Sequence, residues 1–157
     1  MDYYNTISSS YDELHGEEQI KKLSLIKPFL DSKSILDIGC GTGIASPHGS
    51  VGIDPSEELL KLNPNYPEEC ILGSVERLPF QDKSFDIITC LTAIHHFDLN
   101  LALEEMKRVA KKKVIISVLR KSNKFEEIVD AIKESFKVTN YILEEKDVIM
   151  VCQIEES

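Results

Sequence analysis

Three glycines at alternate positions, Gly39, Gly41 and Gly43, follow a short apolar segment over residues 34–38. Glycine adopts positive φ and has no Cβ, so a ligand can lie almost against the backbone of such a loop. A second apolar segment downstream ends in Asp54, whose carboxylate can accept two hydrogen bonds from the hydroxyls of a ribose. Together the glycine loop and this acid predict a ribose-containing ligand.

The spacing of the glycines argues against two common phosphate-binding loops. The dinucleotide fingerprint Gly-x-Gly-x-x-Gly lacks its third glycine, since Ile44 or Ser46 stands there, counting from Gly39 or from Gly41. No Gly-Lys-Ser/Thr follows a glycine loop, as a nucleoside-triphosphate loop requires. The sequence therefore favours a ligand without a pyrophosphate, and it disfavours an NAD-dependent oxidoreductase.

Two adjacent histidines, His95 and His96, follow a nearly all-apolar segment over residues 85–91 that predicts a buried strand. An imidazole at this place can act as a base, although it can equally cap the next helix or pack against a cofactor. No acidic or thiol ligand joins the histidines at fixed spacing, so no metal site is predicted. Arg120 ends a later strand and can bind a substrate carboxylate or phosphate, or remain a solvated cation.

Alternating strands and helices must position these residues. Strands are predicted at 34–38, 51–54, 70–73, 85–91, 114–119, 138–143 and 148–154, and helices at 17–28, 56–60, 99–112 and 125–136. This pattern predicts an α/β fold with a doubly wound, mostly parallel seven-stranded sheet and a C-terminal antiparallel hairpin. Ligands bind such sheets beyond the carboxyl ends of the strands, where the glycine loop, Asp54 and the histidines all fall.

The connection between the first two strands is too short for the usual helix. Only seven residues, 44–50, separate Gly43 from the second strand, and they include Pro47 and Gly49. The connection is feasible as a loop with at most one helical turn. We hypothesise that the N-terminal helix, a second copy of the chain (a homodimer) or a partner protein covers the face left open.

The N-terminal helix is predicted from Glu17 to near Pro28, with Ile20, Leu23 and Ile26 on one face. The residues before it form a polar and aromatic lead-in or lid, and the 157 residues fit a single domain. The absence of an apolar run of membrane-spanning length, of a signal-peptide pattern and of any Cys-x-x-Cys pair predicts a cytoplasmic protein with reduced, mostly buried thiols.

The net charge of −9 disfavours unaided binding of nucleic acid, which needs a basic footprint. Basic residues nevertheless concentrate in the segment 107–124, which holds eight of them and no acid. Lys111 to Lys113 are expected to close a helix, where cations favour the negative end of its dipole. The alternative is an anionic substrate or partner at this segment.

Four segments in order resemble class I S-adenosylmethionine-dependent methyltransferases of the small, methyltransferase-domain-11-like kind. They are the glycine motif 36–43, the segment 51–56, the pair 73–80 with 85–88, and the segment 91–97 after the fourth strand. The resemblance implies a Rossmann-like fold, S-adenosyl-L-methionine as cofactor and methyl transfer as activity. The resemblance does not identify a particular substrate.

The resemblance implies roles for the residues of the first two motifs. Gly39, Cys40 and Gly41 would pack against the methionine part of the cofactor. Asp54 would hold the ribose diol. Asp37 would hold the loop and contact the ammonium group of the cofactor, directly or through water.

Further cofactor contacts follow from the later motifs. Pro55 follows the ribose-binding acid, Ser74 and Val75 would face the adenine, and Leu91 and Thr92 would lie beside the sulfonium. The family usually has an acid where Ser74 stands, so the contact with the adenine amino group is expected to be weaker or lost.

These assignments predict direct in-line methyl transfer to a small molecule or a modified nucleotide. The protein mainly has to align donor and acceptor and exclude water, and it needs a base only if the acceptor must first lose a proton. His95 and His96 are the catalytic candidates, and Tyr11 and Arg120 the substrate-binding ones. The alternatives are a non-catalytic regulatory or scaffold subunit that binds the same cofactor, and a tRNA or protein methyltransferase that requires a partner chain.

Overall fold

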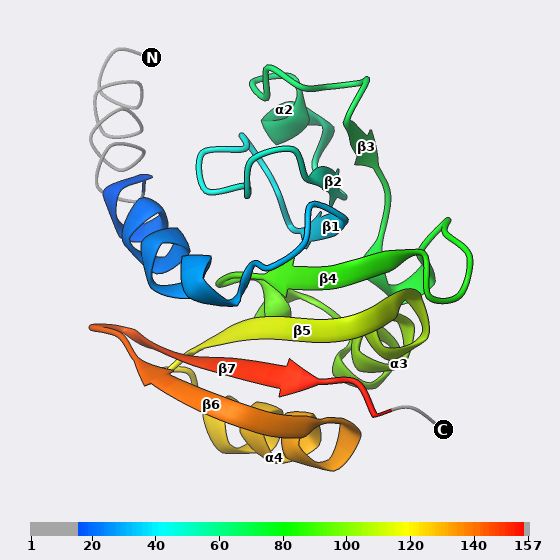
Figure 1. The fold of residues 1–157 in the computed structure, drawn as a ribbon. Helices are drawn as coiled ribbons and strands as arrows, with labels where there is room; N and C mark the ends of the chain where they lie inside the picture. Colours follow the sequence, from blue (N-terminus) through cyan, green and yellow to red (C-terminus); the bar gives the residue numbers. More distant parts are fainter. Residues whose placement is uncertain (1–15, 156–157) are drawn as a thin grey trace.

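A seven-stranded sheet organises the chain, and the computed structural model describes it over residues 16–155. The strands are β1 (Ile35–Ile38), β2 (Val51–Asp54), β3 (Cys70–Leu72), β4 (Phe85–Cys90), β5 (Ala110–Leu119), β6 (Lys137–Leu143) and β7 (Asp147–Gln153). Their order is β3-β2-β1-β4-β5-β7-β6, as Figure 1 shows. β7 runs antiparallel to both β5 and β6, and the other neighbours are parallel. The predicted fold class is confirmed.

Helices lie between and beside the strands. They are a helix over residues 16–26, α2 (Glu57–Leu60), α3 (Leu99–Val109) and α4 (Phe125–Ser135), with the short 3-10 helices η1 (Lys27–Phe29), η2 (Val75–Arg77) and η3 (Ile94–His96). Polar caps fix several starts. The Ser56 side chain accepts a hydrogen bond from the Leu59 amide, and Asp98 accepts one from Leu101, so each satisfies an amide that the first turn leaves free.

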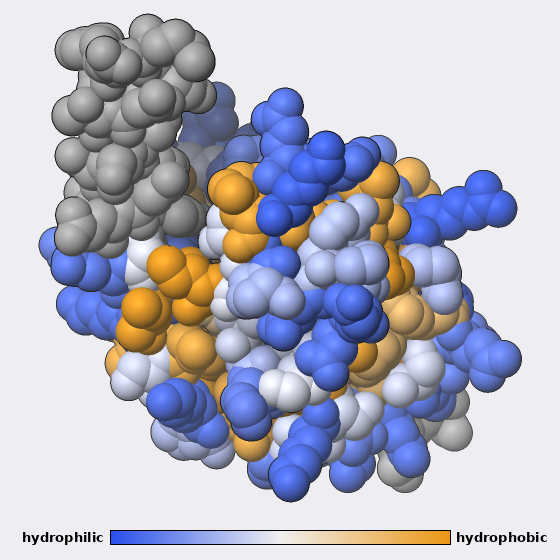
Figure 2. All heavy atoms as spheres, turned by 90° about the horizontal axis from the view of Figure 1, so that it is seen from above, coloured by the Kyte–Doolittle hydropathy of each residue, from blue (hydrophilic) through white to orange (hydrophobic). Residues whose placement is uncertain are grey.

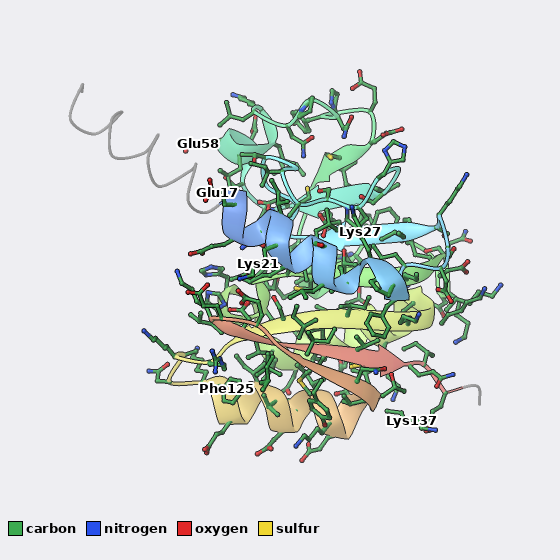
Figure 3. The ribbon with its side chains drawn as sticks, turned by 60° about the vertical axis from the view of Figure 1, so that its left-hand side comes forward. Glu17, Lys21, Lys27, Glu58, Phe125 and Lys137 are labelled. Carbon is green, nitrogen blue, oxygen red and sulfur yellow. The ribbon has the colours of Figure 1, made fainter. Side chains whose placement is uncertain are left out.

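The two faces of the sheet are covered unequally. Alternate residues such as Leu36 and Ile38 join the larger apolar core beneath α3 and α4, whereas Ile35 and its counterparts on β4, β5 and β7 point to the other side. On that second side Leu23 and Ile26 of helix 16–26 pack against them. In Figure 3 this helix, marked by its labelled residues, crosses the sheet on the side away from α4.

The loop between β1 and β2 has no helix, as its length predicted. Four of its residues are glycines with positive φ, between +50° and +82°, and these turn the chain tightly. Beneath it, Cys40, Leu60 and Cys70 form a separate small apolar cluster with Tyr66. Helix 16–26 and this cluster therefore supply cover on the face from which the usual helix is missing.

The prediction for one face of helix 16–26 was partly wrong. Ile20 is 52% exposed, whereas Lys22 on the same helix is 2% exposed. The apolar periodicity predicted that Ile20 points toward the core, and it gave no reason to expect that Lys22 is buried. The buried lysine has an ionic partner, as described below.

The predicted end of α3 was also wrong. α3 stops at Val109, and Ala110 already pairs with Phe85 as the first residue of β5. Lys111 to Lys113 therefore lie on a strand and do not close a helix. Lys113 donates to the carbonyl of Phe29 at 2.7 Å, and the last turn of α3 carries the cations Lys107 and Arg108 instead.

The surface seen from above mixes hydrophilic side chains with apolar patches (Figure 2). Exposed large apolar side chains occur on the β1–β2 loop, on α2, on the segment that follows α2 and on β3, and they are Ile44, Leu59, Leu62 and Leu72. Within residues 16–155, no helix combines the length and apolar character that crossing a bilayer requires.

Candidate functional site

A cavity of about 490 Å³ opens at the carboxyl ends of β1, β2 and β4. Its walls come from the glycine loop, from Asp54 and Pro55 after β2, from the turn 91–97 after β4 and from Gln19 on helix 16–26. This volume lies within the roughly 300–1,000 Å³ that small-molecule sites occupy. Three of the strand ends that were predicted to converge, those of β1, β2 and β4, therefore meet at this cavity.

The glycine loop lies against the end of β2. The amides of Gly39 and Cys40 both donate to the carbonyl of Ile53, at 2.8 and 3.3 Å. A Cβ added at Gly39 would lie 2.8 Å from the Cβ of Ala93, and its φ of +75° is a conformation that side chains disfavour. Only glycine fits at this position, where the loop passes closely beneath the turn after β4.

Asn63 holds the far end of the same loop. Its side-chain amide donates to the carbonyl of Gly41 at 3.1 Å, and its oxygen accepts from the amide of Asn65 at 2.9 Å. A Cβ at Gly43 would lie 2.7 Å from the Asn63 nitrogen, so the absence of a side chain there makes room for this contact. The sequence alone assigned Asn63 no role in the site, because its partners Gly41 and Gly43 are about 20 residues away in the chain.

Asp54 is placed to accept further hydrogen bonds. Its Oδ2 accepts from the Gly41 amide at 2.9 Å, and its Oδ1 accepts from the Ser56 amide at 2.8 Å. A carboxylate oxygen has two acceptor positions, so each oxygen keeps one free. The side chain is 6% exposed and lines the cavity, which suits it to bind a diol there.

Asp37 lies at the end of β1 and lines the same cavity. It accepts hydrogen bonds from the hydroxyls of Ser46 and Thr89, at 2.7 and 2.8 Å. Burial raises the pKa of this carboxyl to about 6, against the effect of the two hydroxyls, and the charge of Asp54 raises it further. A cation bound in the cavity would favour the ionised form.

Cys40 and Cys70 flank Gly52 on β2. A Cβ at Gly52 would lie 2.6 Å from the Cys40 sulfur and 3.1 Å from that of Cys70. Both are buried free thiols, as are Cys90 and Cys152. Burial raises the pKa of Cys40 well above its ordinary value, so the thiol that lines the cavity is a packing group and not a nucleophile.

Thr92 follows β4 in a left-handed conformation, with φ of +58°, and lines the cavity. Its amide donates to the hydroxyl of Ser117 at 2.6 Å. Its own hydroxyl is surrounded by Gln19, Lys22 and Asp147, at 3.3, 3.0 and 3.1 Å. Positive φ is rare for a branched side chain, so this turn is held by its surroundings.

The two histidines differ in their surroundings. His96 is exposed and lines the cavity, whereas His95 is half-buried, and their ring centroids lie 4.0 Å apart. Burial lowers the pKa of His95, as do the charges of His96 and Lys124, while Asp147 acts in the opposite direction. The Nδ1 atom of His95 is buried without a hydrogen-bond partner.

Four predicted site residues within residues 16–155 do not line the cavity, namely His95, Ser74, Val75 and Arg120. Ser74 caps η2 and donates to Glu76, and Val75 is 1% exposed in the main core. Arg120 is exposed and donates to the carbonyl of Glu145 at the β6–β7 turn. Tyr11 lies outside the described residues. Roles for these five residues stay predictions.

Three features together are typical of S-adenosylmethionine-dependent methyltransferases. They are this sheet order with its antiparallel C-terminal hairpin, the glycine loop, and the acid at the end of β2. A family model described as a methyltransferase domain matches residues 36–118, which is more than half of the chain. The chain belongs to this methyltransferase-domain family.

Solved structures share the fold over nearly the whole chain. A Thermotoga maritima protein, described as a SAM-dependent methyltransferase and possible histamine N-methyltransferase, is 20% identical with a TM-score of 0.76, covering 96% of each chain. Magnesium protoporphyrin IX methyltransferase from Synechocystis, solved with bound S-adenosylmethionine, is 15% identical with a TM-score of 0.69, covering 90% of this chain and 80% of that one.

Sequence relatives are longer than this chain. An uncharacterised protein of Methanocaldococcus jannaschii is 35% identical over 117 residues, which are 70% of this chain and 47% of the relative. The chain spans between 36% and 65% of the length of the first curated relatives that it matches.

The residues present fit S-adenosylmethionine. Asp54 offers two free acceptor positions for a ribose diol, the positive-φ glycines allow close approach to the backbone, and Asp37 offers a buried carboxylate for an ammonium group. Leu91 and Thr92 form the part of the wall that comes from the end of β4. This cavity therefore offers the groups that S-adenosyl-L-methionine requires.

Proposed function

We propose that this methyltransferase transfers the methyl group directly, in line, to a small molecule or a modified nucleotide. One observation supports the proposal: residues suited to the donor and a possible base line the same cavity. Gly39 and Asp54 suit the donor, and His96 can accept a proton. A donor and an acceptor bound in one small cavity are held together, which converts a bimolecular reaction into an effectively unimolecular one.

S-adenosylmethionine supplies a methyl group already activated on a sulfonium, so the protein contributes mainly position and exclusion of water. Leu91, Ala93 and Phe97 give the wall after β4 its apolar character. The glycine loop, which is fixed by Asn63 and by the carbonyl of Ile53, forms another part of the wall. These rigid contacts support a preorganised site.

His96 is the residue we propose as base for an acceptor that must lose a proton. It lines the cavity and is exposed, so a substrate can reach it. His95 is half-buried and its pKa is lowered, which favours a neutral ring beside His96 at neutral pH. A neutral neighbour leaves His96 free of a second positive charge when it takes a proton.

A small acceptor is favoured over nucleic acid by charge. The net charge of −9 opposes a polyanion, and the eight basic residues of 107–124 are divided between α3, β5 and the start of α4 and do not surround the cavity. A partner chain that supplies an acceptor site is the alternative for tRNA or protein substrates. The test below distinguishes these cases.

The direct experiment is transfer of a radiolabelled methyl group from S-adenosylmethionine into a fractionated cell extract. Label in a small-molecule or nucleotide fraction is expected. Label that requires an added protein fraction, or that enters tRNA or protein, would replace the proposed acceptor class. Tight donor binding without label in any fraction would favour a scaffold subunit.

Calorimetry on a matched pair of variants tests the donor site itself. Asp54→Asn should weaken binding of S-adenosylmethionine at least tenfold, because a charged acceptor of the diol is lost. Glu57→Gln, which removes the same charge from the neighbouring and largely exposed helix α2, should leave binding unchanged. Equal effects of the two variants would remove Asp54 from the donor site.

A further inference from the structure

One ion pair among the described residues is fully buried. Lys22 Nζ lies 3.2 Å from Asp147 Oδ2, with side chains that are 2% and 0% exposed. The pair joins helix 16–26 to the first residue of β7, which are far apart in the sequence. The other ion pairs found within residues 16–155 each include at least one partly exposed side chain.

A buried ion pair is a poor device for stability alone. Removing two charges from water costs as much as their attraction returns, and apolar residues of similar volume often serve as well or better. The position of the pair is therefore informative. It lies directly behind the wall of the donor cavity and is separated from it by one residue, Thr92.

Thr92 connects the pair to the cavity. Lys22 Nζ and Asp147 Oδ2 lie 3.0 and 3.1 Å from its hydroxyl oxygen, and Gln19 adds a contact at 3.3 Å. A threonine hydroxyl has one donor and two acceptor positions, so these neighbours use its whole capacity. The hydroxyl is thus held toward the ion pair and is not free to bind a ligand.

The two oxygens of the Asp147 carboxylate differ in their contacts. Its Oδ1 is buried without a hydrogen-bond partner, while Oδ2 contacts both Lys22 and Thr92. Glu144, also buried, does not supply this atom with a partner, since its Oε2 accepts from the backbone amides of Lys146 and Asp147. The Asp147 carboxylate therefore keeps an unsatisfied acceptor in a buried place, where each charge of the pair is weakly screened.

We propose that Lys22 and Asp147 are specificity-determining residues: through their opposite charges behind Thr92 they set how strongly the cavity prefers the positively charged methyl donor over its neutral demethylated product. The inference rests on the proposed function and on the position beside the sulfonium that the family resemblance implies for Thr92. It assigns a positioning role as well, because the same pair holds Thr92 in its left-handed turn.

The two charges must act in opposite directions on a cationic ligand. Asp147→Asn removes a negative charge and should lower the ratio of affinities for S-adenosylmethionine and S-adenosylhomocysteine, on the order of fivefold to thirtyfold. Lys22→Met removes a positive charge and should raise the same ratio. A purely structural pair would change both affinities together and leave their ratio unchanged in both variants.

A matched control exists on the same two segments. Lys21 and Glu145 form an ion pair at 3.8 Å between helix 16–26 and the β6–β7 turn, but their side chains are 60% and 73% exposed. Lys21→Met and Glu145→Gln remove the same charges in solvent and should leave both affinities and the ratio unchanged. Figure 3 labels Lys21 on this helix.

Calorimetry with both ligands gives the ratio, and thermal unfolding reports whether each variant folds. Because an unpaired buried charge can prevent folding, Gln19→Glu provides a second test that leaves the pair intact. It adds a carboxylate beside Lys22 and Thr92 and should raise the ratio. An unchanged ratio in Gln19→Glu and in the folded single variants would overturn the inference while donor binding by the parent protein stands. Failure of the parent to bind the donor would instead overturn the proposed function.

Discussion

Asn63 donates its side-chain amide to the carbonyl of Gly41 at 3.1 Å, across a loop that has no helix behind it. In this fold the segment after the glycine motif normally continues as a helix, which would anchor the loop at its far end. Here a buried side chain from the segment between α2 and β3 supplies that anchor, with Asn63 only 4% exposed. The rigidity of the donor site therefore depends on a residue outside the glycine motif.

Replacing this anchor should affect both stability and ligand binding. Asn63→Ala leaves the Gly41 carbonyl and the Asn65 amide without their partner, which should cost about 1–3 kcal/mol of unfolding free energy. S-adenosylmethionine affinity should fall by roughly tenfold or more, because the loop must be ordered on binding. Urea unfolding and calorimetry measure the two effects. Asn65→Ala, at an exposed position, is the control that should show neither.

A second prediction compares two glycines of the same loop. Gly43 and Gly49 have similar φ, +82° and +77°, but a Cβ at Gly43 would meet Asn63 at 2.7 Å, whereas a Cβ at Gly49 would meet nothing within 4 Å. Gly49→Ala should therefore cost only the strain of the left-handed conformation, about 1–2 kcal/mol. Gly43→Ala should cost more and also reduce donor affinity. If urea unfolding gave equal losses of unfolding free energy for Gly43→Ala and Gly49→Ala, the clash at Gly43 would be relieved without displacing Asn63.

Local sequence patterns predicted most strands because their causes are local. Residues 85–90 are nearly all apolar, as a strand covered on both faces must be, and the hairpin of β6 and β7 followed from the lack of room for a helix. The boundary between α3 and β5 was misplaced because Ala110 to Lys113 suit a helix by composition. Only their pairing with β4, which is distant in sequence, makes them a strand.

The parts of the site that sequence did not reveal depend on contacts between distant segments. Asp37 and Asp54 stand in recognisable motifs, and both line the cavity. Lys22 and Asp147 belong to no motif, and each is ordinary in its own segment, a lysine in a charged helix and an acid at a turn. Their burial appears only when helix 16–26 and the hairpin meet behind Thr92.

Asp37 carries a prediction about stability and pH. Its pKa is raised from an ordinary value of 3.8 to about 6, so the folded protein without ligand binds a proton more tightly than the unfolded chain. Its contribution to stability therefore falls as pH rises from about 3.8 to about 6 and stays low above that. Asp37→Asn should raise the unfolding free energy of the ligand-free protein at pH 7.5 by up to about 3 kcal/mol. Urea unfolding at several pH values measures this.

The same substitution should weaken donor binding. In the parent protein, affinity for S-adenosylmethionine should increase as pH rises through about 6, because the ionised carboxylate favours the cationic ligand. Asp37→Asn should lower the affinity at pH 7.5 about tenfold or more and remove this pH dependence. Calorimetry between pH 5 and 8 tests both statements. A variant that binds as well as the parent would show that Asp37 serves the loop alone.

The last prediction compares His96 with an exposed histidine that does not line the cavity. His96 lines the cavity, so His96→Gln should reduce methyl transfer by about a hundredfold or more if it takes the proton of the acceptor, with donor affinity unchanged. His48→Gln, at an exposed histidine of the β1–β2 loop, is the matched control and should retain full transfer. The measurement is label transfer into the fraction that the parent protein labels. Full transfer by His96→Gln would mean that the acceptor reacts without a base from this residue, as a neutral amine or a thioether would.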